Sequence, residues 1–199
     1  MTAIITGDII NSTSDNQSTW LHCLREVLKQ YGSEPKKWEI FRGDSFQIEV
    51  EPKIALHCAI HIKAAIKQQS EIDVRMAIGI GDKNYSSKKI TESNGEAFIF
   101  SGKSFDALDK NRLIVKTARQ SFDEEINLYL DLASLTMDQW LPATAHMVKI
   151  ALEHPDFNQS QISTLIKKSQ SHVSQTLKRA GYETILKMIN AFQHKVISL

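Results

Sequence analysis

The sequence predicts an α+β fold in which an antiparallel sheet with helices precedes an all-α region. Three observations carry this prediction. Apolar residues alternate through positions 38–50 on both sides of Arg42-Gly43-Asp44, the pattern of a half-buried hairpin. Strand-like and helix-like patterns then alternate up to about residue 117. After His154-Pro155-Asp156 the apolar residues recur only with helical spacing.

The first half of the chain has the element order strand, helix, hairpin, helix, strand. This order is that of a ferredoxin-like palm, an antiparallel sheet with helices on one face. An irregular polar stretch at 81–95, a helix at 97–108 and a short edge strand at 113–117 should follow. The predicted elements of the palm are a strand at 2–7, a helix at 20–31, a hairpin at 38–50, a helix at 53–69 and a strand at 74–80.

From residue 119 onward the sequence predicts helices only. One helix should begin at 119 and run to 133, and a further one should span 137–153, with Pro142 in its first turn. The chain is therefore divided into an α/β domain (1–118), connecting helices (119–156) and a helix-turn-helix region (157–199). In that region we expect Ile162, Leu165 and Ile166 on the inner face of the first helix and Val173 and Leu177 on that of the second.

Composition is that of a folded protein, since 42% of the 199 residues are apolar and 24% are charged. No apolar run approaches the ~20 residues of a membrane helix, and no signal-peptide pattern precedes the first strand, so a cytoplasmic protein is expected. Cys23 and Cys58 lie in apolar helical patterns and should be buried free thiols. His57 and His61, four residues apart, are expected on a solvated face.

Charge is distributed unevenly along the chain. Residues 157–199 hold six basic side chains against the single acid Glu183, a net charge of +5, whereas the whole chain carries +1. The preceding 156 residues therefore carry −4. A basic tail on a mildly acidic body suggests a polyanionic partner, although lysines are also common on ordinary solvated helices.

Two carboxylates lie at predicted strand ends. Asp8 ends the first strand, and Asp44 lies at the tip of the hairpin. If they meet in space they repel each other unless a cation lies between them, and Mg²⁺ bound to nucleotide phosphates would supply that cation. The alternative is that both are ordinary turn and cap carboxylates.

The same residues carry a family resemblance. Asp8-Ile-Ile-Asn-Ser-Thr13 resembles the first-strand metal motif of class III nucleotidyl cyclases, and Arg42-Gly43-Asp44 resembles their hairpin. Together with the helix-turn-helix, nearly the whole chain is similar to the SatD family of bacterial proteins. The resemblance implies a nucleotide-cyclase-like palm with Asp8 and Asp44 as metal ligands. The nucleotide would then contact a set of polar and basic positions: Asn11, Ser12, Thr13, Arg42, Gly43 and Lys103.

Two departures argue against turnover. Ile40 stands where the cyclases have a base-selecting lysine, and Phe98 falls near their transition-state asparagine. Lys103 is at best a substitute for the missing arginine. Conversion of a nucleotide is therefore not expected, and binding without conversion is left as an alternative.

The predicted helix pair at 158–181 resembles the helix-turn-helix of bacterial regulators, although Lys167 replaces the usual turn glycine and Lys168 an apolar residue. Glutamine and serine can bond base edges, and arginine can pair with guanine or phosphate. The alternative is a helical hairpin used only for dimerisation. The expected DNA contacts are Ser169, Gln170, Ser171, His172, Gln175, Thr176, Lys178 and Arg179.

These patterns together predict a homodimeric bacterial transcriptional regulator that binds DNA through its tail. Its degenerate cyclase-like domain would sense a ligand or dimerise. The alternative from a different class is an enzyme, a Mg²⁺-dependent nucleotidyl cyclase. A third is a non-catalytic assembly module, against which the +5 tail argues.

Overall fold

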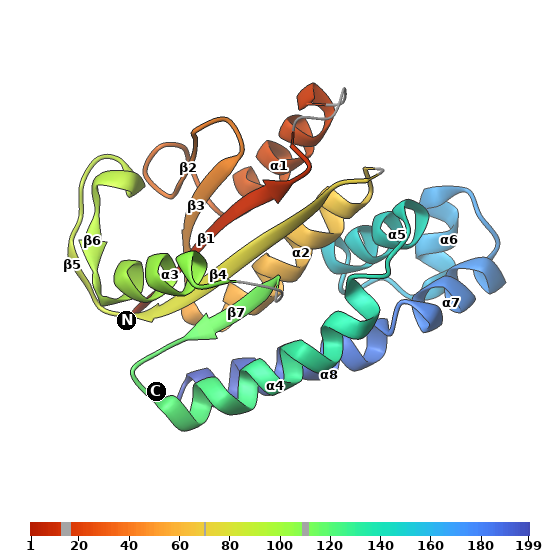
Figure 1. The fold of residues 1–199 in the computed structure, drawn as a ribbon. Helices are drawn as coiled ribbons and strands as arrows, with labels where there is room; N and C mark the ends of the chain where they lie inside the picture. Colours follow the sequence, from red (N-terminus) through yellow and green to blue (C-terminus); the bar gives the residue numbers. More distant parts are fainter. Residues whose placement is uncertain (13–16, 70, 109–111) are drawn as a thin grey trace.

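The computed structural model describes residues 1–12, 17–69, 71–108 and 112–199. It is an α+β structure with one five-stranded sheet in the order β2-β3-β1-β4-β7 and helices around it (Figure 1). The strands are β1 (Thr2–Ile10), β2 (Trp38–Phe41), β3 (Ser45–Val50), β4 (Asp73–Gly81) and β7 (Leu113–Lys116).

The predicted hairpin is confirmed. β2 and β3 pair antiparallel across the turn at 42–44, with Ile40 opposite Phe46. Arg42 (φ 55°) and Gly43 (φ 93°) adopt the left-handed conformations that reverse the chain in so short a turn. β1 then lies between β3 and β4 and is antiparallel to both.

The sheet is mixed, so the prediction of an antiparallel sheet holds for four strands only. β7 pairs parallel to β4 because the chain crosses over the sheet through α3 (Glu96–Asp106) before it returns. β7 does lie at the sheet edge, as predicted. The polar stretch expected at 81–95 contains the small sheet of β5 (Lys83–Tyr85) and β6 (Asn94–Gly95), with the 3₁₀ helix η2 (Ile90–Glu92) between them.

Helices cover both faces of the sheet, which corrects the expectation of helices on one face. α1 (Gln17–Tyr31) and α2 (Ala55–Lys67), which follows the 3₁₀ turn η1 (Pro52–Ile54), lie on one face. α3 lies on the other, so close that a Cβ on Gly79 would stand 2.2 Å from the Ala97 carbonyl oxygen. Glycine in β4 thus permits the approach of α3.

The second half of the chain is helical, as predicted. Its helices are α4 (Gln120–Met137), α5 (Pro142–Glu153), α6 (Gln159–Ile166), α7 (Gln170–Arg179) and α8 (Tyr182–Val196). The predicted start of the second helix at Met137 is wrong, because α4 continues to that residue. α5 begins instead at Pro142, whose fixed φ and missing N–H suit a first helical position.

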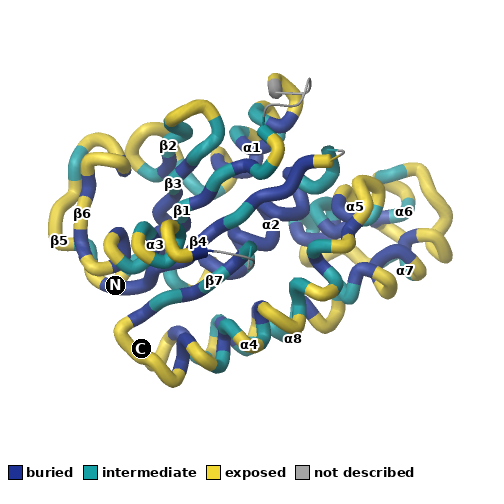
Figure 2. The backbone as a smooth tube through the Cα atoms, viewed as in Figure 1, coloured by how far each residue is buried: buried dark blue, intermediate teal, exposed yellow. Residues whose placement is uncertain are grey.

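One hydrophobic core joins the sheet to the C-terminal helices. It continues from Phe46 and Met76 in the sheet, through α2, to Val148 in α5 and Phe192 in α8. Figure 2 shows β4 and α2 mostly buried and the outward sides of α4, α6 and α7 exposed. The core therefore crosses both expected domain boundaries, at 118 and at 156.

α4 covers the free edge of β7 through side chains. The Asn127 amide accepts a hydrogen bond from the Val115 N–H (2.8 Å) and donates one to the Val115 carbonyl (2.9 Å). Asp123 accepts from the Thr117 N–H at 2.9 Å and pairs with Lys116 at 2.7 Å. These bonds replace those that a neighbouring strand would make.

Within the described residues, no helix combines the length and the apolar character needed to cross a bilayer.

Candidate functional site

The strongest candidate site is the pair α6 and α7 with the turn between them, which we call the α6–α7 unit. Both helices begin at side-chain caps. Asn158 and Gln161 form a reciprocal capping box at the start of α6, and the Ser169 hydroxyl accepts from the His172 N–H at the start of α7. Local sequence thus fixes where each short helix begins.

The turn of the α6–α7 unit depends on Lys167. This residue adopts the left-handed conformation (φ 54°, ψ 45°) in which helices often end. Glycine adopts it without the steric cost that a Cβ brings, which explains why glycine is usual in such turns. A lysine here adds an exposed positive charge instead.

The inner face of the unit is nearly as predicted. Ile162, Val173 and Leu177 are buried and Ile166 is partly buried. Leu165 is the exception, because it is 49% exposed. It follows Ile162 by three positions but turns outward.

The outer face of α7 is polar and accessible. Six of the eight residues expected to contact DNA are exposed on it: Gln170, Ser171, His172, Gln175, Lys178 and Arg179. Ser169, also exposed, caps the helix.

Thr176 corrects the sequence prediction. It is 4% exposed and therefore cannot reach a partner across the outer face. Helix geometry gives the reason, since position 176 lies three residues after Val173 and next to Leu177, on the inner side.

The α6–α7 unit carries positive charge without acids. Residues 159–179 include Lys167, Lys168, Lys178 and Arg179 and no Asp or Glu. None of these four cations forms an ion pair with any residue that the structure describes, and all four are exposed. Such a surface is complementary to a polyanion.

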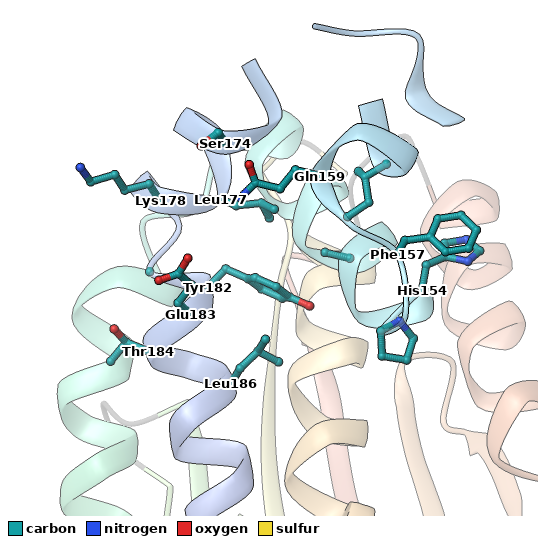
Figure 3. Close-up of a pocket in the computed structure, with 14 residues that line it drawn as sticks. His154, Phe157, Gln159, Ser174, Leu177, Lys178, Tyr182, Glu183, Thr184 and Leu186 are labelled. Atoms are coloured by element: carbon teal, nitrogen blue, oxygen red, sulfur yellow. The ribbon is translucent and has the colours of Figure 1, made fainter. Parts of the chain in front are cut away.

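A cavity of about 560 Å³ lies beneath the unit, between α5, α6, α7 and α8 (Figure 3). His154 and Phe157 stack on one side with their ring centroids 4.6 Å apart. The phenol of Tyr182 points into the cavity from α8, and burial raises its pKa to about 12, so it stays protonated. Lys178 extends outward from the rim. Periodicity could not have revealed this cavity, because its walls come from four helices.

The second candidate is the cluster at the end of β1. Asp8 lies opposite Ser45 of β3, so the structure brings it beside the hairpin turn that holds Asp44. Arg75 in β4, which is opposite Asp8 on the other side, binds it with two hydrogen bonds of 2.7 Å. The hydrogen bond to Asp8, aided by the charges of Asp8 and Asp44, raises the pKa of Arg75.

Arg75 supplies a cation to Asp8 within the fold. Its role follows from the register of β1 against β4, which places it opposite Asp8 and which the sequence pattern alone does not specify. Asp44 is held separately, because its carboxylate accepts from the Ser12 hydroxyl at 2.6 Å. Across the described parts of the chain, no cluster of three His, Cys, Asp or Glu side chains suits a metal ion. As built, the cluster does not fit Mg²⁺, because both Asp8 oxygens bind Arg75.

Of the other expected nucleotide contacts, Ser12 and the turn at 42–43 lie next to Asp44. The Asn11 amide donates to the Glu71 carbonyl at 2.9 Å, and Arg42 and Gly43 are exposed at the hairpin tip. Lys103 is exposed on α3. Thr13 lies outside the described residues.

His57 and His61 are not on a solvated face, which corrects that expectation. His61 is 1% exposed, and its Nε2 donates to Glu153 at 3.2 Å, because a carboxylate can only accept. The Tyr31 hydroxyl lies 2.9 Å from Nδ1 of His61 and 3.1 Å from Nδ1 of His57. This network, in which Lys149 also binds Glu153, joins α1 and α2 to α5, the helix before the α6–α7 unit. The residues of α5 that complete it are too distant in sequence for helical spacing to reveal.

Comparisons with known proteins found no family model that matches the sequence and no curated relative.

Proposed function

We propose that the protein is a transcriptional regulator that binds double-stranded DNA through the α6–α7 unit, used as a helix-turn-helix. The observation that carries the proposal is the outer face of α7. It is polar and basic and has no acid, and its cations have no acidic partner among the described residues. A ten-residue helix of this kind suits the width of the major groove.

Each exposed side chain then has an expected role. Gln170, Ser171 and Gln175 would bond base edges, and Arg179 would bind guanine or a phosphate. Lys167, Lys168 and Lys178 would contact phosphates, which position the protein on the duplex without reading sequence.

The α/β part has a degenerate palm in this proposal. The antiparallel order β2-β3-β1-β4, with α1 and α2 on one face, supports the ferredoxin-like interpretation. A relationship to the SatD family would account for this palm and the α6–α7 unit in one chain. The palm would bind a ligand or stabilise the fold.

Observations at the β1 end favour this role over the alternative of a Mg²⁺-dependent cyclase. Asp8 would have to leave Arg75 before it could bind a metal ion. Ile40 in β2 and Phe98 in α3 have apolar side chains, so neither offers a polar contact for a base or ribose. A cyclic nucleotide formed from a triphosphate with Mn²⁺ or Mg²⁺, and lost in Asp8→Asn, would favour the enzyme instead.

The test is DNA binding by the full chain, measured by gel shift on genomic fragments and then by fluorescence anisotropy on the selected sequence. Arg179→Ala should weaken binding by about 1–3 kcal/mol if Arg179 reads a base. Affinity should also fall steeply with salt, since lysine–phosphate contacts release counterions. The matched control is Lys88→Ala, which removes an exposed cation between β5 and β6 and should leave affinity unchanged.

Equal losses in Arg179→Ala and Lys88→Ala would contradict the assignment of the site to α7. Point variants are preferable to removal of residues 157–199, because that deletion would also remove Phe192 from the shared core.

A further inference from the structure

α4 presents a row of leucines away from the core. Leu128, Leu132 and Leu135 are 57%, 60% and 73% exposed. Their spacing of four and three residues aligns them along one side of the helix, and we call this row the leucine ridge. Three large exposed apolar side chains in one row mark a contact surface rather than ordinary surface scatter.

A groove runs beside the leucine ridge. It lies between α4 and α8, has a volume of about 470 Å³, and shares Leu132 as part of its wall. Small or apolar side chains make up most of its lining, including Ala133 of α4 and Met188 and Ala191 of α8. The surface thus offers both a ridge and a groove that suits such a ridge from another molecule.

Charges flank these two features on opposite sides. Asp131 lines a different small cavity with Arg112 and Ser134, so it lies on the side of α4 away from the groove. Glu124 lies on the same side, because residues seven apart on a helix nearly align. Lys187 of α8 lines the groove itself. At the level of Asp131 and Lys187 the order across the surface is therefore acid, leucine ridge, groove and lysine, and Glu124, Asp131 and Lys187 are exposed. Farther along the two helices, Glu125 of α4 and Lys195 of α8 pair with each other at 3.0 Å.

We propose that this surface binds a second copy of the same chain, with the two α4 helices parallel and the twofold axis along them. A twofold contact pairs one surface with itself. With the axis along α4, the order across one copy is reversed in the other. The leucine ridge of each copy then enters the groove of its partner, and Asp131 faces Lys187 of the partner subunit. An antiparallel pair would instead set ridge against ridge and acid against acid.

The parallel arrangement has a consequence that rests on the proposed function. α4 ends and α8 begins at the end of the molecule that carries the α6–α7 unit (Figure 1). Both units therefore lie at the same end of the dimer and can meet one duplex. Dimeric readers of this kind bind half-sites about 34 Å apart, which predicts a palindromic target.

The test measures oligomeric state without DNA, so its result is independent of the proposed function. Sedimentation equilibrium of the full chain should show a dimer. Leu132→Asp should raise the dimer dissociation constant by at least about tenfold, with an unchanged circular dichroism spectrum because the side chain is exposed. Ile99→Asp, which charges an apolar residue 48% exposed on α3, is the control and should remain dimeric.

A charge exchange tests the orientation. Asp131→Lys and Lys187→Asp should each weaken the dimer, and the double variant should restore it if the two residues meet across the interface. A double variant weaker than either single one would overturn the parallel arrangement. A monomeric wild-type chain, or an Ile99→Asp chain as monomeric as Leu132→Asp, would overturn the interface. DNA binding by a monomeric chain would support the proposed function and contradict only the proposed dimer interface.

Discussion

The α/β part holds buried ion pairs, whereas all the charges of the α6–α7 unit are exposed. In the α/β part, Lys63 is 1% exposed and lies 3.0 Å from Asp73 and 2.7 Å from Asp138, and Arg75 holds Asp8. In the α6–α7 unit, four exposed cations have no acid beside them in the described chain. Charges paired within the fold stabilise it. Exposed cations without an acidic neighbour are hydrated, add little to the stability of the fold and stay accessible to an anionic partner, so this contrast distinguishes the scaffold from the proposed binding surface.

The largest expected effect tests whether the α/β part and the C-terminal helices share one core. Phe192 of α8 is fully buried and lies 5.9 Å from Phe122 of α4, measured between ring centroids. Phe192→Ala should lower the free energy of unfolding by about 3–5 kcal/mol through lost burial and a new cavity. The measurement is urea unfolding followed by circular dichroism and by fluorescence. In a Trp140→Phe background, the fluorescence reports on Trp20 and Trp38 of the α/β part.

The two probes should give one coincident transition, shifted equally by Phe192→Ala. An unshifted tryptophan transition would mean that α8 belongs to a separately folding domain. Leu141→Ala, at a leucine 70% exposed, is the control and should change stability by less than about 0.5 kcal/mol.

A smaller effect compares two arginines. Arg75→Ala should lower the free energy of unfolding by about 1–2 kcal/mol, because it leaves Asp8 without two charged hydrogen bonds and near Asp44. Arg179→Ala should change it by less than about 0.5 kcal/mol, since Arg179 is exposed and unpaired within the described chain. Thermal and urea unfolding of both variants measure the difference. Equal losses would remove the contrast between scaffold and binding surface.

The smallest expected effect is a loss of stability at acidic pH. Burial, reinforced by the charge of His61, lowers the pKa of His57. Its neutral form is therefore favoured by folding, and that stability is present above the ordinary value of 6.5 and lost as pH falls below it. Between pH 7 and 5 the free energy of unfolding should fall by less than about 1 kcal/mol, and His57→Gln should flatten this slope. His172→Gln, at an exposed residue of α7, should not.

Glu153 adds a second fall at lower pH. Burial alone would raise its pKa, but hydrogen bonds from His61, Lys149 and Gln30 lower it to about 2. This contribution is present above the ordinary value of 4.5 and is lost as pH falls toward 2. It should persist in His57→Gln, which distinguishes the two groups.

Periodicity predicted most elements because each depends on near neighbours. The hairpin at 38–50 follows from alternating apolar residues, and the helix predicted at 20–31, which is α1, follows from apolar residues at helical spacing. The parallel pairing of β7 and the position of α3 could not be predicted this way. Both depend on which sheet face remains open after α1 and α2 pack, and on Gly79, whose role appears only when α3 lies against it.

The candidate sites also differ in whether they depend on near neighbours or on residues distant in the chain. The outer face of α7 was predicted with one error, Thr176, which lies at the edge of the inner face where a small side chain can turn inward. The role of Asp8 depends on Arg75, which is 67 residues away in the chain. Charge partners across a sheet require the strand register, and the sequence had indicated the strands without their pairing.

The side chains that α4 sets against β7 affect how the protein behaves at high concentration. An open strand edge can recruit a strand from another molecule and seed ordered aggregates. Asn127 occupies the N–H and carbonyl of Val115, and Asp123 occupies the N–H of Thr117, so this edge has little left to offer an incoming strand. Growth of the sheet by recruitment is thereby blocked on this side, and crowding should favour finite assemblies of folded chains over fibres.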